Sequence, residues 1–432
     1  MNFENRPTHS LRPYAGNART HSPKQIKQIS RSIERFGFNN PVLVDDDNQI
    51  IAGHGRVEAA KLLNMKTVPT VRLSHLSEAE KRAYILADNR LAEKAGWDND
   101  TLAIELQGLV DIGFDVLLTG FEPAEVDIII EGIGDESEQP ENLVPEEPSG
   151  PPVSCLGDVW MLGKHLLVCG DSTDAATYKF LMGDEKAEFV FTDPPYNVRI
   201  DGHVSGLGRV KHREFAMASG EMSEGQFTTF LSSAYALLCR YSTDGSIHQI
   251  CMDWRHMREM LAAGDAHYAE LKNVCIWNKT NGGMGTFYRS KHEMVFVWKN
   301  GSAPHLNTFE LGQHGRNRTN VWDYEGVNTM RAGRMDELAM HPTVKPVAMV
   351  AEAIKDCSRR GSLILDPFCG SGTILIAAEK TGRRARAIEL DPCYVDVAIR
   401  RWEQYSGKTA GLAPMGETFE EVAESRLGST AP

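Results

Sequence analysis

The sequence predicts an α/β protein in which a large sheet of mostly parallel strands follows a smaller N-terminal domain. From about residue 154 onward, apolar runs typical of buried strands alternate with helical patterns, and this alternation favours parallel strands with helices on both faces. The chain of 432 residues is too long for one ordinary domain. An acidic stretch rich in proline and glycine, residues 132–153, divides it.

Composition narrows the class of protein. The hydrophobic content of 41% and charged content of 24% are typical of a soluble globular protein, and no apolar run is long enough to predict a membrane span. The first residues lack the apolar core of a secretion signal, and none of the 8 cysteines forms a C-x-x-C pair. We therefore expect a reduced, cytoplasmic protein without a metal site or a disulfide framework.

The net charge of −13 bears on the partners that the protein can bind. A protein that binds DNA only non-specifically is normally basic, so the acidic total disfavours that class. An enzyme that acts on DNA needs only a local basic surface, which the total charge still permits.

Residues 1–131 predict helices and short strands. Ser22 is suited to cap a helix, and Ser77 with Glu80 has the spacing of a capping box before another helix. The runs PVLV and QIIAG flank the acidic turn DDDN and predict a hairpin. Residues 132–153 have no apolar periodicity and predict a flexible linker, although a surface loop within one domain is the alternative.

We expect the α/β domain to span residues 154–407, and residues 408–432, which lack a clear pattern, to form a loose tail. The predicted strands are HLLVCGD, EFVFTD, SIHQICMD, NVCIWNK, EMVFVWK, SLILDP and RRARAIEL. Because the chain runs out soon after RRARAIEL, the run HLLVCGD is the natural candidate for the strand beyond it. Asp171 would then lie near Glu389, although it could instead only cap the helix that follows it.

The glycine-rich turn FCGSGT lies between the predicted strand SLILD and a helix, and this arrangement predicts a site for a nucleoside cofactor. Gly370 and Gly372 let the backbone approach a ligand, and Glu389 can accept hydrogen bonds from both hydroxyls of a ribose. Leu375 replaces the third glycine of the dinucleotide pattern, so an adenosine ligand other than NAD is favoured. The alternative is a turn that only permits close packing of the helix on the strand.

The turn DPPY follows the apolar run AEFVF and should lie at the carboxyl edge of the sheet, where ligands bind. Two prolines remove N–H groups, so the turn presents acceptors, namely the Asp193 carboxylate and the carbonyl groups of Asp193 and Pro194. Tyr196 adds a flat face for stacking. These groups suit the exocyclic amine of a base that has left the duplex. The alternative is a proline-rich turn with a buried tyrosine.

Together, DPPYN and DPFCGSGT resemble the motifs of the amino-group DNA methyltransferases that use S-adenosylmethionine. Their order, with the catalytic motif first, resembles the circularly permuted β class of this family, and HPTVKP at residues 341–346 resembles a further motif. The resemblance covers about residues 155–405 and implies methylation of the N6 amine of adenine, because the motif is DPPY rather than SPPY. Methylation of N4 of cytosine is the alternative.

The resemblance also implies site residues, and no metal is among them. The implied catalytic residues are Asp193, Pro194, Pro195 and Tyr196. The implied cofactor-binding residues are Asp171, Asp366, Phe368, Gly370, Gly372, Thr373, Glu389 and Lys345.

Two basic stretches are candidates for contacts with double-stranded DNA, in which phosphate contacts supply affinity and base contacts specificity. The first follows DPPY, predicts a mobile loop that closes over a flipped base, and carries Arg199, Arg209, Lys211 and Arg213. The second lies before HPTVKP, where the β class has its target-recognition region, and carries Arg316 and Arg318. Any one of these side chains could equally belong to a solvated charged loop.

The run IIAGHGRVEAAKLLNMKTVPTV resembles the ParB-like fold of partition proteins, over about residues 5–95. The family's G-E-R-R-type turn, which can bind nucleotide phosphates, is here GHGR, so His54 and Arg56 are a candidate phosphate site. The alternative is a scaffold turn with Arg56 in a local ion pair. Sulfiredoxin shares this fold, but its activity needs a cysteine there, and none precedes Cys155.

The leading hypothesis is therefore a site-specific DNA adenine-N6 methyltransferase, of the kind found in restriction–modification systems, with an appended ParB-like domain. The alternatives are an N4-cytosine methyltransferase, a ParB-like DNA-binding or partition switch with an inactive methyltransferase domain, and an NAD-dependent enzyme. A homodimer is expected from the resemblance alone. The sequence gives neither the recognition site nor a companion restriction endonuclease.

Overall fold

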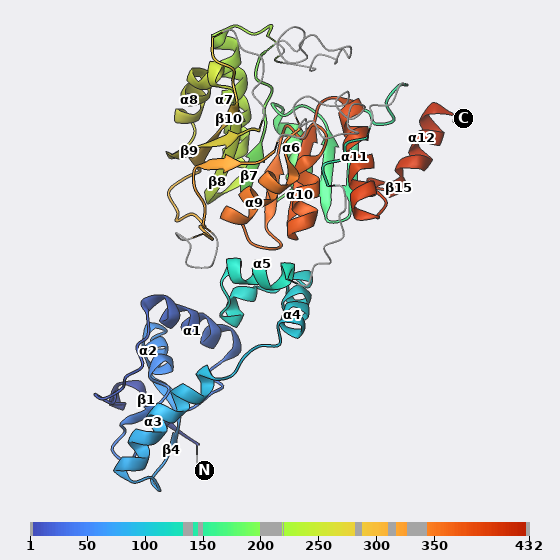
Figure 1. The fold of residues 1–432 in the computed structure, drawn as a ribbon. Helices are drawn as coiled ribbons and strands as arrows, with labels where there is room; N and C mark the ends of the chain where they lie inside the picture. Colours follow the sequence, from blue (N-terminus) through green and yellow to red (C-terminus); the bar gives the residue numbers. More distant parts are fainter. Residues whose placement is uncertain are drawn as a thin grey trace. The chain divides into compact units, whose positions relative to one another are not determined.

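The structure is a computed structural model that divides into two units, Met1–Gly134 and Asp135–Pro432 (Figure 1). The residues it describes are 3–132, 141–145, 150–198, 218, 220–280, 287–309, 317–325 and 344–428. The division between the units falls inside the predicted linker, residues 132–153.

The first unit contains a sheet with the strand order β1-β4-β2-β3. The strands are β1 (Phe3–Pro7), β2 (Val42–Val44), β3 (Ile50–Ala52) and β4 (Thr67–Arg72). Strands β2 and β3 form the predicted antiparallel hairpin, while β4 runs parallel to β2 and antiparallel to β1. Asp45 closes the hairpin turn because its Oδ1 accepts hydrogen bonds from Asp47 N at 2.9 Å and Gln49 N at 2.8 Å.

Two helices of the first unit begin at the caps that the sequence predicts. Ser22 accepts a hydrogen bond from Gln25 N, and Ser77 and Glu80 form a reciprocal capping box, which confirms both predicted starts. The α-helices are α1 (Pro23–Phe36), α2 (His54–Leu62), α3 (Glu78–Glu93), α4 (Asn99–Asp111) and α5 (Pro123–Glu131), and the 3-10 helices are η1 (Thr8–Ser10) and η2 (Val116–Thr119). Helices α4 and α5 share a small apolar cluster of their own.

The second unit is built on one sheet whose order within the described residues is β11-β9-β10-β8-β7-β12-β13-β6-β5-β14-β15. Its strands are β5 (Val159–Leu162), β6 (His165–Cys169), β7 (Ala187–Thr192), β8 (Ser242–Met252), β9 (Glu270–Asn278), β10 (His292–Lys299), β11 (Val321–Asp323), β12 (Leu363–Asp366), β13 (Arg384–Glu389), β14 (Gly411–Leu412) and β15 (Glu417–Thr418). All seven predicted strands are present.

The centre of this sheet, β8-β7-β12-β13-β6, is parallel, and β6 pairs with β13 as the sequence predicted. The prediction of a mostly parallel sheet is wrong for the flanks, because β10 is antiparallel to β8 and β9, and β5 is antiparallel to β6 and β14. Only two residues join β5 to β6, and a parallel pair needs a much longer crossover.

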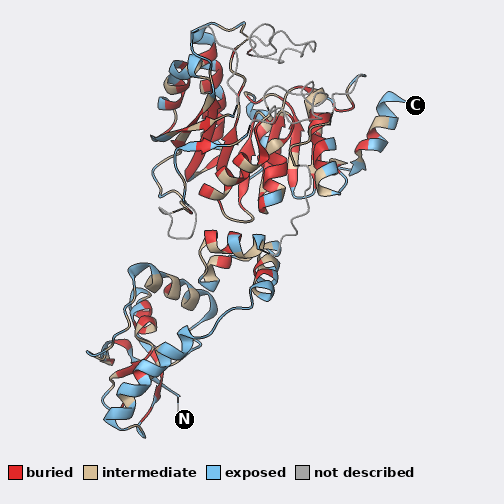
Figure 2. Ribbon diagram, in the orientation of Figure 1, coloured by how far each residue is buried: buried red, intermediate tan, exposed pale blue. Residues whose placement is uncertain are grey.

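Helices cover both faces of the sheet, as predicted (Figure 2). They are α6 (Ala175–Met182), α7 (Glu224–Arg240), α8 (Met257–Asp265), α9 (Val347–Cys357), α10 (Thr373–Thr381), α11 (Pro392–Ser406) and α12 (Phe419–Leu427), with the 3-10 helix η3 (Trp254–His256). Helices α9, α10 and α11 pack into one apolar cluster, and α6, α7 and α8 pack into the other. The central strands contribute side chains to both clusters, so they are buried on both faces.

The prediction of a loose tail over residues 408–432 is wrong for the described part of that segment. Strand β14 pairs with β5, and α12 begins with a capping box of Thr418 and Glu421. The ring of Phe419 is 4% exposed and lies 5.5 Å from the ring of Trp160. A segment this short shows little periodicity, and its burial depends on a distant strand that sequence reasoning does not place.

Part of the predicted flexible linker is bound to the second unit. Asn142 Oδ1 accepts a hydrogen bond from Val347 N at 3.1 Å. The Asp396 carboxylate accepts from Val153 N at 2.7 Å and Ser154 N at 3.0 Å. These residues are therefore ordered by the α/β unit rather than forming a free connection. Among the helices of the described residues, none combines the length and the apolar character that a membrane span requires.

We expect the Phe419→Ala variant to lose about 3–5 kcal/mol of stability in the second unit, because the change leaves a cavity beside Trp160. Urea unfolding followed by tryptophan fluorescence measures this loss, since Trp97 is the one tryptophan in the first unit. The control is Leu427→Ala in the same helix, where the side chain is 39% exposed and the expected change is about 0.5 kcal/mol. Equal losses in both variants would contradict the packing of α12.

Candidate active site

A cavity opens at the edge of the sheet where the parallel strands β6, β7, β12 and β13 end. The predicted catalytic residues Asp193, Pro194, Pro195 and Tyr196 all line it. Five of the predicted cofactor residues line the same cavity, namely Lys345, Phe368, Gly370, Thr373 and Glu389. The structure therefore brings the DPPY turn and the glycine-rich turn, about 175 positions apart in the sequence, into one site.

Three predicted cofactor residues stand outside the described lining of this cavity, namely Asp171, Asp366 and Gly372. Asp171 follows β6, next to Glu389 as predicted, because Gly170 N donates to Glu389 O at 2.8 Å. Its Oδ1 accepts from the backbone N and the hydroxyl of Thr173, each at 2.7 Å, so it closes a local turn. Asp174, rather than Asp171, caps α6.

Asp366 connects the strand that precedes the DPPY turn with the glycine-rich turn. Its Oδ1 accepts hydrogen bonds from Thr192 Oγ1 at 2.7 Å and from Phe368 N at 3.0 Å. Burial raises the pKa of Asp366 to about 7, although these two hydrogen bonds act in the opposite direction. The carboxyl group thus ties the end of strand β7 to the start of the glycine-rich turn.

The two glycines of the turn are required for different reasons. Gly370 has φ +52°, and a Cβ added there would meet open space, so its backbone can lie against a ligand. Gly372 has φ +83°, and a Cβ there would lie 2.9 Å from the Cβ of Ala398 in α11. The first glycine therefore leaves room in the cavity, while the second permits close packing of α11 behind the turn.

Arg401 in α11 supports the glycine-rich turn from behind, and sequence reasoning missed it. Its Nη1 donates to Ser371 O at 3.1 Å and to Thr373 Oγ1 at 3.1 Å. Burial lowers the pKa of Arg401 to about 10. In the sequence this arginine looks like one more charge on an amphipathic helix.

Glu389 lines the same cavity as the DPPY turn and lies at the end of β13. Its Oε2 accepts from Gly370 N at 2.7 Å and its Oε1 accepts from Asp391 N at 2.9 Å. Burial raises the pKa of Glu389 to about 7, and the backbone N–H groups oppose this rise. Each oxygen retains lone-pair capacity, as a pair of ribose hydroxyls would need.

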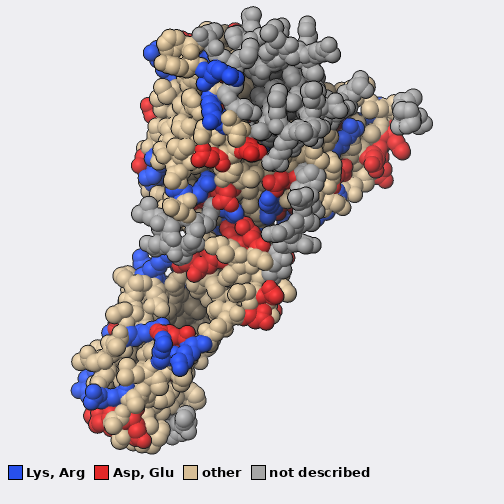
Figure 3. Space-filling view, in the orientation of Figure 1, with Lys and Arg blue, Asp and Glu red and all other residues tan. Residues whose placement is uncertain are grey.

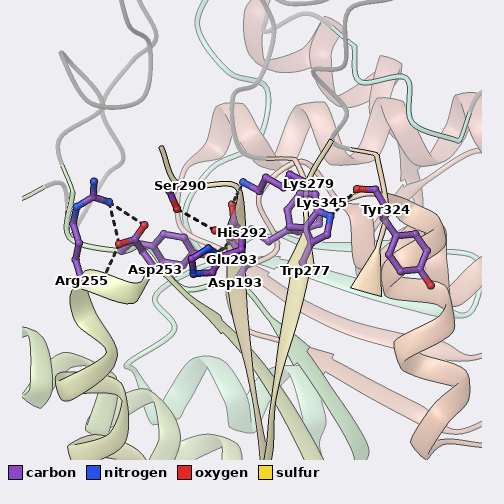
Figure 4. A network of polar contacts seen from close by, with 11 residues as sticks. Asp193, Asp253, Arg255, Trp277, Lys279, Ser290, His292, Glu293, Tyr324 and Lys345 are labelled. Carbon is purple, nitrogen blue, oxygen red and sulfur yellow. Dashed lines mark hydrogen bonds and ion pairs between the residues drawn. The ribbon is translucent and has the colours of Figure 1, made fainter. Parts of the chain in front are cut away.

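The DPPY turn is part of a buried polar network (Figure 4). Tyr196 OH donates to Asp193 Oδ1 at 2.5 Å, and Lys345 Nζ donates to Asp193 Oδ2. Lys345 Nζ also lies 2.9 Å from Glu293 Oε2, and Lys279 Nζ pairs with Glu293 Oε1. Lys345, predicted as a cofactor residue, is thus 5% exposed and bound directly to Asp193 of the DPPY turn.

The network contains two ammonium groups, those of Lys345 and Lys279, and two carboxylates, those of Asp193 and Glu293, so its formal charges balance. Burial acts to raise the pKa of Glu293, but the charges of Lys345 and Lys279 prevail and hold it at about 2. Burial raises the pKa of Asp193 as well, against the effect of Lys345. The Asp193 side chain is still 25% exposed, so a ligand in the cavity can reach it.

Sequence reasoning missed Glu293, Lys279 and Trp277 as members of the site. Trp277 Nε1 donates to Tyr324 O at 3.0 Å, and Lys279 Nζ lies 4.6 Å from the centroid of the Trp277 ring. The runs NVCIWNK and EMVFVWK predict strands and resemble the middle motifs of the β class, but neither observation assigned a role to these three residues. Glu293 reaches the site because β10 is antiparallel, so its first residues lie where the parallel strands end.

Most of the predicted DNA-contacting residues lie outside the described part of the chain, namely Arg199, Arg209, Lys211, Arg213 and Arg316. Arg318 is described and is bound internally. Its Nε donates to Asp356 Oδ2 at 3.0 Å, its Nη1 donates to Tyr324 OH at 3.2 Å, and its side chain is 15% exposed. A DNA contact by Arg318 would compete with this ion pair.

The candidate phosphate residues of the first unit contact nearby backbone. His54 Nε2 lies 3.2 Å from Tyr14 N and accepts its hydrogen, while Arg56 Nη2 donates to Pro41 O at 3.3 Å. Burial lowers the pKa of both side chains. Both residues thus support the turn before α2, and phosphate binding there stays a prediction.

We expect Gly372→Ala to destabilise the second unit more than Gly370→Ala. Both changes put a Cβ on a left-handed backbone, at a cost of about 1–2 kcal/mol each. The Gly372→Ala change also forces the new Cβ to overlap with Ala398, which adds about 1–3 kcal/mol to the loss of stability. Thermal unfolding of the two variants measures the difference, and equal melting temperatures would contradict the close approach of α11 to the turn.

Comparisons with known proteins identify both units. Residues 187–400 match the N6/N4 DNA methylase family, and residues 6–90 match the ParB N-terminal domain. Residues 100–156 match the HTH domain described for ParB–methyltransferase proteins. The matches thus cover the glycine-rich turn, the DPPY turn and most of the first unit.

Two curated relatives each match a short share of the chain. The chain is 53% identical over 77 residues to the ParB-like nuclease domain-containing protein YnaK of Escherichia coli (strain K12). This match covers 18% of this chain and 88% of YnaK. The chain is 39% identical over 89 residues to the Type II methyltransferase M.ScaI of Streptomyces caespitosus. This match covers 21% of this chain and 29% of M.ScaI. Among solved structures, the M1.HpyAVI–SAM complex is 17% identical with a TM-score of 0.40, covering 54% of this chain and 97% of that one.

The family match confirms the predicted methyltransferase fold and, with it, S-adenosylmethionine as the cofactor. The family includes enzymes that methylate N6 of adenine and N4 of cytosine, so the match alone does not distinguish these bases. Through its first unit the chain belongs to the ParB-like domain proteins, and its second unit is a DNA methylase domain of the N6/N4 family.

Proposed function

We propose that the protein is a site-specific DNA methyltransferase that methylates the N6 amine of an adenine flipped out of double-stranded DNA. The observation that carries this proposal is the single cavity lined by both the DPPY turn and the glycine-rich turn. A methyl donor bound at one turn and a base amine bound at the other would meet inside that cavity.

The residues around the glycine-rich turn fit S-adenosylmethionine, which when bound supplies an electrophilic methyl group on its sulfonium. Open space at Gly370 leaves room for the ligand against the backbone. The Glu389 carboxylate can accept both ribose hydroxyls, and Phe368 offers an apolar face in the lining. Asp171, close to Glu389 at the end of β6, is the proposed acceptor for the adenine amine of the cofactor.

The DPPY turn fits the amine of the target base. Pro194 and Pro195 have no N–H groups, so this stretch of backbone presents carbonyl acceptors alone. Hydrogen bonds from the amine to Asp193 and to the Pro194 carbonyl would favour a pyramidal nitrogen whose lone pair is free to attack. Tyr196 would stack on the flipped base and hold it in place.

The aspartate at the first position of DPPY supports adenine over cytosine. The order of the motifs, with DPPY before the glycine-rich turn, supports the permuted β class. N4-cytosine methylation is the second candidate, because the matched family includes both reactions.

We assign the contacts with DNA to the methylase unit rather than to helices α4 and α5, although the latter match an HTH domain. Residues 98–131 contain nine Asp and Glu residues and no Lys or Arg, and Figure 3 shows acidic side chains over these helices on the face it presents. Such a segment repels phosphates, which normally supply most of the affinity for DNA.

We expect Asp193→Ala to lower the rate of methylation by a factor on the order of 100 or more, because the amine loses its charged acceptor. The assay incubates unmethylated DNA with S-adenosylmethionine and measures modified nucleosides by mass spectrometry. N6-methyladenine is the expected product. N4-methylcytosine would instead support the second candidate function, N4-cytosine methylation, with the same mechanism. Asp184→Ala, at an exposed turn, is the matched control and should leave the rate unchanged.

The affinity for S-adenosylmethionine should increase as the pH rises through about 7, where the buried Glu389 ionises. The ionised carboxylate is the better acceptor for ribose hydroxyls, whereas the protonated form keeps one oxygen as a donor. Calorimetric titration at about pH 6 and about pH 8 measures the change. The Glu389→Gln variant cannot ionise and should lose this pH dependence. A dependence that persists in the variant would assign it to Asp366, which titrates in the same range.

A further inference from the structure

We propose that Glu293 is a positioning residue that receives Lys345 and Tyr196 when the base amine takes their places on Asp193. This inference rests on the proposed function and adds a step to it. It assigns a role to a carboxylate that the DPPY mechanism itself does not use.

In the structure, both oxygens of the Asp193 carboxylate already hold a donor. Tyr196 OH donates to Oδ1 at 2.5 Å, and Lys345 Nζ donates to Oδ2. A base amine that enters the cavity needs a strong acceptor at the same carboxylate. Binding of the base therefore requires that at least one of these two donors change its partner.

Glu293 is within reach of both displaced donors. Its Oε2 lies 2.9 Å from Lys345 Nζ and 3.2 Å from Tyr196 OH. Lys345 Nζ also lies 3.4 Å from Tyr196 OH, so the ammonium, the hydroxyl and Glu293 Oε2 are all within hydrogen-bonding distance of one another. Each donor can leave Asp193 and keep a hydrogen bond without a large movement. Without Glu293, a displaced ammonium would be buried and unpaired, which is costly.

Lys279 sets the strength of this alternative acceptor. It pairs with Glu293 Oε1, the oxygen that does not face Lys345, and it lies over the ring of Trp277. Because the network has one ammonium for each carboxylate, Lys345 forms ion pairs with both Asp193 and Glu293 rather than with one of them alone. The lysine is shared between them, which is the condition for an easy exchange.

The position of Glu293 follows from the fold. It lies on β10, two strands away from β7, and reaches the DPPY turn because β10 begins at the edge where β7 ends. Lys345 enters from the segment just before α9. Figure 4 shows Asp193, Glu293, Lys279 and Lys345 converging from these separate elements.

The decisive experiment is a double-mutant cycle with Glu293→Gln and Lys345→Met. Initial rates of methyl transfer from radiolabelled S-adenosylmethionine are measured against the concentration of unmethylated DNA, and cofactor affinity is measured by calorimetry. We expect Glu293→Gln to lower kcat at least tenfold with cofactor affinity within twofold of wild type, because Lys345 then stays bound to Asp193.

Adding Lys345→Met to Glu293→Gln should restore the rate at least severalfold, since no ammonium then blocks Asp193. A merely structural role for Glu293 would not produce this recovery. Glu270→Gln breaks an exposed carboxylate–lysine pair with Lys272 and is the control that should match wild type.

Three results would overturn the inference. They are a Glu293→Gln variant as active as wild type, a double variant no more active than Glu293→Gln, and a parallel loss of cofactor affinity. A wild-type protein that yields no methylated nucleoside would instead overturn the proposed function itself. Thermal unfolding of each variant excludes loss of the fold as the cause of a low rate.

Discussion

The parallel pairing of β7 with β12 is the constraint on which the site depends. Strands that are parallel neighbours end at the same edge, so the DPPY turn after β7 and the glycine-rich turn after β12 face one cavity. The hydrogen bond from Thr192 to Asp366 fixes the two strand ends to each other at 2.7 Å. Burial of these strands on both faces leaves little freedom for either turn to shift.

Around this framework, each turn is supported by a buried charged group. Arg401 holds the glycine-rich turn through Ser371 and Thr373, while Lys345 holds the DPPY turn through Asp193. Both cations are almost completely buried and bonded to several acceptors, which offsets the cost of removing a charge from water. The supporting groups come from α11 and from the segment before α9, so the site is held by elements distant in the sequence.

The two units differ in the surfaces that they offer. The cavity lined by the DPPY turn and the glycine-rich turn belongs to the second unit. The first unit adds a ParB-type sheet with helices, and its acidic segment, residues 98–131, is unsuited to phosphate contacts. Under the proposed function, an acidic protein of this kind needs only a local basic surface to bind DNA.

The sequence by itself determined the local features of this protein. The capping box at Ser77, the strand runs and the donor-free Pro-Pro turn depend on residues a few positions apart, so they are readable without the fold. Only the tertiary structure decided the rest of the site and the fate of the last segment. Glu293 joins Asp193 through the antiparallel direction of β10, and Phe419 is buried through a strand about 260 positions earlier. Such contacts depend on strand order and direction, which no local pattern contains.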